Sequence, residues 1–176
     1  MHLSPLKLES CYYTDVRITS QSESTPEDAN EYEIAVTLEV TSVNPDRPLS
    51  RFIFLSVYIN PKEGKTPPYV GQVDVMGKFT VDNSWPPDRL EELVYVNGSG
   101  LLYASVREMI CAITARSFFE MISIPSWSFG KMYAELKEKR KQEQESQDQL
   151  KLEPSASAGN ELGGPIASAG DQSKTP

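Results

Sequence analysis

The sequence is poor in the residues on which most catalytic and metal sites depend. Its 176 residues include a single histidine, His2. Serine and cysteine nucleophiles are commonly activated by a histidine base, and many zinc sites use histidine ligands. The sequence also contains no P-loop and no dinucleotide-binding glycine motif after a strand. We therefore predict that the protein is not an enzyme and has no catalytic residue, no metal site and no cofactor.

Cysteine and long apolar runs are also scarce. Cys11 and Cys111 are the only cysteines, too few for a disulfide framework. No apolar run approaches the roughly 18 residues of a membrane span. The first ten residues, MHLSPLKLES, have no basic region followed by an apolar core, so they do not resemble a secretory signal. These features predict a protein of the reducing cytoplasm that is not inserted in a membrane.

The net charge of −8 is concentrated in the first half of the chain. Residues 1–96 hold 15 acidic and 8 basic side chains, whereas residues 97–133 hold 2 and 3. This balance disfavours nucleic acid as a partner. The acidic residues of the first half are interpreted either as a solvated sheet face or as a face that docks a basic partner.

Four segments of the first half have the pattern of strands, at 6–18, 31–40, 51–59 and 69–81. In the first, we expect Leu6, Leu8, Tyr12, Val16 and Ile18 to share one side. The third, RFIFLSVYI, is apolar on both faces, so it is covered on both sides or contributes to an adhesive surface. Short connections rich in Pro, Asn, Asp and Gly favour antiparallel neighbours. The prediction is a four-stranded antiparallel sheet.

The second half is predicted to be helical. A short helix over 88–96 is expected to end at Asn97-Gly98, and a longer one to begin near Ser99. The short segment Gly98-Ser99-Gly100 is interpreted as a helix cap or, alternatively, as an anion site. Apolar residues then recur at the spacing of one helix face: Leu102, Val106, Met109, Ile110 and Ile113. This stripe can cover one face of the sheet.

A last helix is predicted to begin near Ser126 or Ser128 and to continue through the charged segment KEKRKQEQESQDQ. The overall prediction is an α+β fold with two main helices packed on one face of the sheet. We expect three parts: a domain over 1–136, a charged helical extension over 137–153 and a disordered tail over 154–176.

The connection between the two main helices, here called the crossover, is unusually apolar. It contains Phe118, Phe119, Met121, Ile122, Ile124 and Trp127. Connections normally run over the surface and are polar. The crossover is therefore either buried or available to bind apolar partners, and burial in a homo-oligomer is a further alternative.

This order of segments resembles the SecB chaperone family over roughly residues 6–136. The helix start LLYASVRE, residues 101–108, is similar to the family's ILFPYARE, and Ile122-Ser123-Ile124 to its LNL. Residues 128–133 resemble its NFDALF/Y ending. In the sheet, Tyr13-Thr14-Asp15 and the segment from Val73 to Phe79 are similar to family strand motifs. The chain departs from the family at Ala104, Ser117 and Glu120, where the family carries proline or glycine.

The resemblance implies an ATP-independent, tetrameric chaperone that holds unfolded precursors and delivers them to the motor SecA. Apolar grooves between the sheet and the crossover would bind clients through Phe54, Phe79, Phe119, Met121, Ile122, Ile124 and Trp127. The resemblance assigns SecA docking to Asp15, Val70 and Gln72. Asp15 and Val70 match the family there, whereas Thr19 and Gln72 stand where the family has glutamate. Gly71, Val73 and Val75 match positions of oligomer assembly.

Two other functions are consistent with the same residues. One is a SecB-like chaperone dedicated to an antitoxin or another single client. The other is a non-catalytic interaction subunit whose apolar surface is buried in a fixed complex.

Overall fold

The computed structural model describes residues 4–42 and 49–152, with side chains described as far as residue 147. The predicted disordered tail lies outside these residues. The chain divides into two compact units, Met1–Lys137 and Glu138–Pro176. The first unit contains the sheet, the helix that covers it and the crossover.

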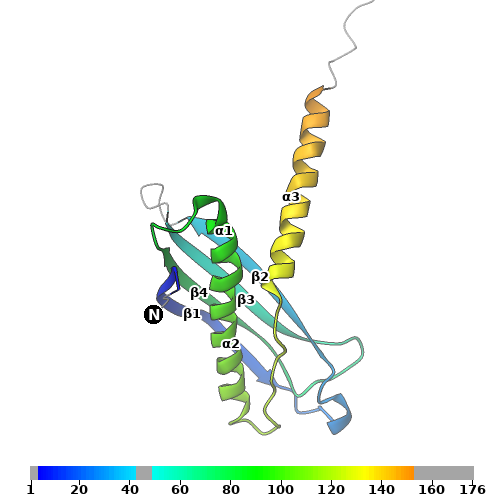
Figure 1. The fold of residues 1–176 in the computed structure, drawn as a ribbon. Helices are drawn as coiled ribbons and strands as arrows, with labels where there is room; N and C mark the ends of the chain where they lie inside the picture. The colour runs from blue at the N-terminus through cyan, green and yellow to red at the C-terminus, as the bar shows by residue number, and fades with distance from the viewer. Residues whose placement is uncertain (1–3, 43–48, 153–176) are drawn as a thin grey trace, which may run out of the picture. The chain divides into compact units, whose positions relative to one another are not determined.

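Four strands form one antiparallel sheet, as predicted, and their order in it is β1-β4-β3-β2 (Figure 1). Their bounds are β1 Leu6–Ser20, β2 Tyr32–Ser42, β3 Ser50–Pro61 and β4 Tyr69–Val81. A short 3-10 turn, η1 Pro26–Asp28, lies in the connection from β1 to β2. The order leaves β1 and β2 as the two edges of the sheet.

The alternation of strand side chains separates a buried face from an open face. On β3, Ile53, Leu55, Val57 and Ile59 are each at most 1% exposed. The residues between them point to the other side, where Phe54 is 40% exposed. The third strand is therefore apolar on both faces because one face forms the core and the other belongs to an open, partly apolar surface.

β1 does not keep the simple alternation that the sequence predicts. Its pairing with β4 shifts register between Leu8 and Ser10 and again between Tyr13 and Asp15. Each irregularity exchanges the two faces for the residues that follow. The prediction for Tyr12 is therefore wrong, since this side chain is exposed and lies beside Met76 on the open face.

The helical part begins with η2 Pro87–Arg89 and continues as α1 Leu90–Leu93, the π-helical segment η3 Val94–Gly98, and α2 Ser99–Thr114. The predicted helix end at Asn97-Gly98 is wrong, because Gly98 keeps right-handed helical angles. Glycine is required at this position because no room is left for a side chain. A Cβ atom there would collide with Cδ1 of Ile53 and would lie 3.6 Å from Cζ of Phe79.

α2 lies across one face of the sheet (Figure 1). Leu102, Val106 and Ile110 are fully buried on its inner side, which confirms the centre of the predicted stripe. The contact is close at Gly77 of β4, where a Cβ atom would lie 2.8 Å from Cδ2 of Leu102. α2 can approach the sheet this closely only because β4 has no side chain at that position.

The last helix, α3 Phe129–Leu152, begins where predicted, directly after Ser128. Its first residues belong to the core, with Phe129 and Tyr133 buried. From residue 137 to 147 every described side chain is exposed. This exposure agrees with the charged sequence of residues 137–147, which offers no apolar face to bury.

The glycine at position 98 gives a direct test of the packing. Replacement by alanine forces a methyl group against Ile53, and overpacking of this kind costs about 1–3 kcal/mol. We expect Gly98→Ala to lower the free energy of unfolding by this amount in urea titrations. Gly100→Ala is the matched control, because nothing lies within 4 Å of its Cβ position. Equal stability of the two variants would contradict the packing described.

Candidate binding site beside the crossover

The crossover, residues 115–128, has no regular secondary structure, and side chains of α2 bind its backbone. Tyr103 donates its hydroxyl hydrogen to the carbonyl of Pro125 at 2.7 Å. Arg107 Nε donates to the carbonyl of Ile124 at 3.0 Å, and Cys111 Sγ to that of Ile122 at 3.4 Å. The three donors are four residues apart, so they lie on one side of α2. We call this set of bonds the α2 ladder.

Two further bonds fix the first half of the crossover. The fully buried Thr114 accepts the backbone N–H of Ile122 on Oγ1 at 3.2 Å and donates to the carbonyl of Ile110 at 2.9 Å. Tyr69 of β4 donates its hydroxyl hydrogen to the carbonyl of Phe119 at 3.0 Å. Backbone groups of the crossover thus find partners without a helix or a strand.

The side chains of the crossover divide between the core and the solvent. Ile122 and Ile124 are buried, whereas Met121 is 55% exposed and Phe118 is 92% exposed. Phe119 is half-buried and packs edge-on against Tyr69, with ring centroids 5.9 Å apart. The crossover therefore closes the core with some of its apolar side chains and presents others to solvent, and its binding of apolar partners stays a prediction.

A cavity of about 660 Å³ lies between the crossover and the connection from β1 to β2. It is named the crossover cavity, and its lining residues are Ser24, Thr25, Pro26, Ala29, Asn30, Tyr32, Pro68 and the run Phe118–Ser123. Burial raises the pKa of Tyr32, and the nearby Cys111 raises it further. The Tyr32 hydroxyl is therefore neutral near pH 7. The lining is mainly apolar with hydroxyl and amide groups among the rings.

Three of the predicted client-binding residues, Phe119, Met121 and Ile122, line this cavity. Ile124 and Trp127 lie further along the crossover and are not part of the lining. Trp127 instead packs near Tyr103, with ring centroids 6.5 Å apart.

The structure does not bring Phe79 and Phe54 to the cavity. Phe79 is fully buried among the core residues, so it has no surface to offer a client. Phe54 points to the open face of the sheet because it alternates with the buried Ile53 and Leu55. The sequence could not separate these two aromatic residues because the third strand is apolar on both sides.

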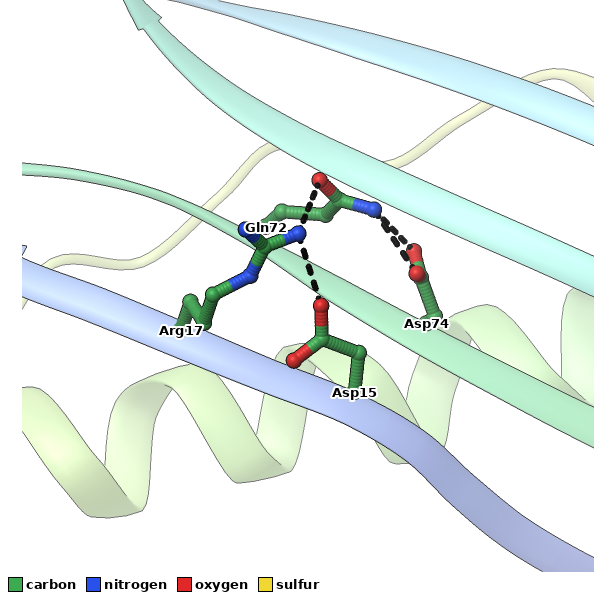
Figure 2. Close-up of polar contacts among 4 residues, drawn as sticks. All are labelled: Asp15, Arg17, Gln72 and Asp74. Atoms are coloured by element: carbon green, nitrogen blue, oxygen red, sulfur yellow. Dashed lines mark hydrogen bonds and ion pairs between the residues drawn. The ribbon is translucent and has the colours of Figure 1, made fainter.

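Asp15, Val70 and Gln72 share the open face of the sheet. Figure 2 shows that Arg17 connects two of them, with one guanidinium nitrogen 2.7 Å from Asp15 Oδ2 and 3.1 Å from Gln72 Oε1. Gln72 Nε2 in turn donates to both carboxylate oxygens of Asp74, at 2.8 and 2.7 Å. The carboxylate of Asp15 is thus paired within the chain, which the sequence did not indicate.

The residues predicted at an oligomer interface face inward. Val73 and Val75 are at most 1% exposed in the single chain because they lie on the face covered by α2. Gly71 lies against β1, where a Cβ atom would collide with the carbonyl oxygen of Arg17. The assignment of these residues to an oligomer interface stays a prediction, and in the single chain Val73 and Val75 already pack in the core.

Within the described part of the chain, no three or more His, Cys, Asp or Glu side chains are grouped so as to hold a metal ion. The helices of this part include none that is both long and apolar enough to cross a membrane.

The sheet, the covering helix and the crossover together define the fold of the SecB-like chaperones. The SecB-like chaperone Rv1957 of Mycobacterium tuberculosis, solved in complex with a ChAD peptide from the HigA1 antitoxin, superposes with a TM-score of 0.55. The superposition has 12% sequence identity and covers 70% of this chain and 91% of that one. At this identity the likeness shows the fold alone.

A second solved structure, a protein of unknown function from Streptococcus agalactiae, is more distant. It has a TM-score of 0.39 at 11% identity, over 71% of this chain and 100% of that one. No family model and no curated protein matches the sequence.

The buried hydroxyl of Thr114 offers a test of how the crossover is held. Thr114→Val keeps the shape but leaves the Ile122 N–H without its acceptor, and an unsatisfied buried group costs about 1–3 kcal/mol. We expect lower stability in urea and faster proteolysis within the crossover. Thr37→Val on the exposed side of β2 is the control and should change little. A crossover that resists protease equally well in both variants would argue against the role of this bond.

Proposed function

We propose that this protein is a non-catalytic, ATP-independent chaperone that binds unfolded polypeptide segments in the crossover cavity. The observation that carries the proposal is an open cavity of about 660 Å³ with Phe118 and Met121 exposed at its margin. Apolar side chains that gather in one exposed patch commonly mark a site of interaction, unlike those scattered singly over a surface. Methionine and aromatic rings adapt to many apolar shapes, as a binder of varied clients requires.

The physical basis of binding would be burial of apolar surface, worth about 25 cal/mol per Å². Ser24, Thr25, Asn30 and Ser123 add hydroxyl and amide groups to the lining. Groups of this kind can bond the backbone of an extended client, which is the same for every sequence. The cavity therefore supports binding that depends on apolar content and extended shape more than on particular side chains.

Two client ranges agree with these features. The sequence resemblance favours a holdase for protein export in the cytoplasm, with unfolded precursors as clients. The neighbour of similar fold was solved with an antitoxin peptide, which favours a chaperone dedicated to one client. A fixed interaction subunit is a further candidate, since Tyr12 and Phe54 expose apolar surface on the open face of the sheet.

Delivery to SecA is proposed to use the open face, through Asp15, Val70 and Gln72. Arg17 lies among these side chains and pairs with Asp15, so this region is less acidic than its carboxylates alone suggest. A homotetramer is proposed from the resemblance. Because Val73 and Val75 are occupied by the core, assembly would use other surfaces, of which the edges at β1 and β2 present unpaired backbone groups.

A charge at the margin of the cavity tests the proposed function. We expect Met121→Asp to weaken binding of an unfolded client at least about tenfold, because an apolar client would have to desolvate the new carboxylate. Fluorescence anisotropy with an unfolded peptide and light scattering of an aggregating client measure the effect. Leu101→Asp is the control, since Leu101 is a half-exposed apolar residue of α2 outside the cavity lining.

A protein that neither binds unrelated unfolded peptides nor suppresses aggregation would contradict a general holdase. Binding of one antitoxin peptide alone would identify a dedicated chaperone. Binding of no peptide by a protein of monomeric mass would leave the fixed subunit as the better description.

The acceptor can be tested through the open face. If SecA docks there, Asp15→Lys should reduce SecA binding about tenfold or more. The substitution replaces an acidic side chain by a basic one, beside Arg17, and this positive charge would repel the basic surface expected on the partner. Surface plasmon resonance with immobilised SecA measures the change. Glu63→Lys, in the turn between β3 and β4, makes the same charge change elsewhere. Equal losses for both variants, or no binding by the unaltered protein, would rule out docking at this face.

A further inference from the structure

The side of the crossover cavity opposite the crossover is formed by residues 21–31, here called the outer wall. Its η1 turn contains no buried residue. The outer wall therefore has little apolar packing of its own to keep it in place, unlike the crossover, which is anchored by Ile122 and Ile124. Other contacts must hold the cavity at its observed width.

The turn between β3 and β4 supplies those contacts. Lys65 Nζ lies 3.1 Å from Asp28 Oδ1, and Lys62 Nζ lies 2.9 Å from Glu31 Oε2. The backbone N–H of Lys62 also donates to the carbonyl of Glu31 at 3.1 Å. The turn that presents both lysines depends on Gly64, whose φ is +69°. A hydrogen bond from the N–H of Lys65 to the carbonyl of Lys62 closes this turn.

The two ion pairs hold different parts of the outer wall. At its start, the N–H of Gln21 donates to the carbonyl of Pro68, and at its end Glu31 is bound to Lys62 through backbone and side chain. Asp28 lies between these fixed ends, next to the lining residue Ala29 and two residues after Pro26, which also lines the cavity. Its carboxylate is only 18% exposed, and Lys65 is its ion-pair partner. The Lys65–Asp28 pair is thus the contact best placed to set the width of the cavity.

We propose that Lys62 and Lys65 are positioning residues that hold the outer wall against the bound segment, and that ionic strength therefore tunes client affinity. The inference rests on the proposed function, because it assigns a regulation to the same cavity. A wall held by charge can be displaced to admit an extended polypeptide and then restored. A wall held by a packed core could not move without partial unfolding.

The size of the effect follows from the fraction of molecules with the wall in place. Apparent affinity falls in proportion to that fraction. Each partly exposed ion pair shifts such an equilibrium by about fivefold at most. Screening shortens the reach of charges from about 10 Å at 0.1 M salt to about 3 Å at 1 M. Loss of both pairs is therefore expected to weaken binding about three- to tenfold.

The test uses the full chain and an uncharged, unfolded apolar peptide, so that salt does not act on the client's own charge. We expect its Kd to rise about threefold or more when both lysines are replaced, in Lys62→Met with Lys65→Met. This variant should also lose the salt-dependent weakening shown by the unaltered protein. Lys7→Met is the control, because it removes an exposed ion pair, to Glu9, far from the cavity lining.

Rescue separates a role of charge pairing from a general loss of stability. Lys65→Asp alone should weaken binding, and its combination with Asp28→Lys should restore the Kd to within about twofold. Unchanged Kd in the double methionine variant would overturn the proposal. A charge exchange without recovery, while the thermal midpoint stays constant, would overturn it as well.

Hydrogen exchange keeps this inference distinct from the proposed function. The amides of Asp28 and Ala29 donate within the outer wall, to Thr25 and Pro26. They should exchange faster in the double methionine variant even if no peptide binds. In that case the client-binding function would be wrong, while the role of Lys62 and Lys65 in holding the outer wall would stand. Equal exchange rates in the double methionine variant and the unaltered protein would overturn the role of the two lysines in holding the outer wall.

Discussion

The structure depends on the contact of α2 with the sheet, since this one helix supports two different neighbours. Its inner side packs Leu102, Val106 and Ile110 against the apolar residues of β3 and β4. The approach is close because glycine stands at positions 77 and 98. Another side of α2 carries the ladder of donors that binds the crossover. Displacement of α2 would therefore expose the core and release the crossover together.

The candidate site combines a rigid side with one that is weakly held. The crossover is fixed by buried isoleucines and by hydrogen bonds to α2 and β4. The outer wall has no buried residue in its η1 turn and is bound by partly exposed ion pairs. Such a combination would suit the proposed capture of an extended chain, because the fixed side offers a constant apolar surface while ion pairs, and not a packed core, hold the other side.

The open face of the sheet owes its residues to irregular pairing in β1. The register shift before Asp15 places this carboxylate on the open face, opposite Asp74, while Tyr13 keeps its ring on the inner face and bonds Ser105 of α2. Without that shift Asp15 would point toward the core. The polar network of Figure 2 thus depends on backbone geometry as much as on residue identity.

Periodicity in the sequence was sufficient to predict the four strands and the stripe of α2, while the short connections predicted the antiparallel pairing. These features depend on residues that are close together in the sequence, so a short stretch of the chain is enough to recognise them. The helix end at Asn97-Gly98 was predicted wrongly. A sequence does not distinguish a glycine that is required for close packing from one that ends a helix. The two register shifts of β1 were likewise not predicted from the alternation of its apolar and polar residues.

The sequence by itself determined that the chain forms an antiparallel sheet covered by helices and that the crossover is too apolar to be an ordinary loop. Only the tertiary structure decided which apolar side chains remain accessible. Phe79 and Val73 are buried, Phe54 lies on the opposite face, and Phe119 and Met121 line a cavity completed by residues about ninety positions earlier. Burial arises from contacts between distant segments, and no local pattern carries that information.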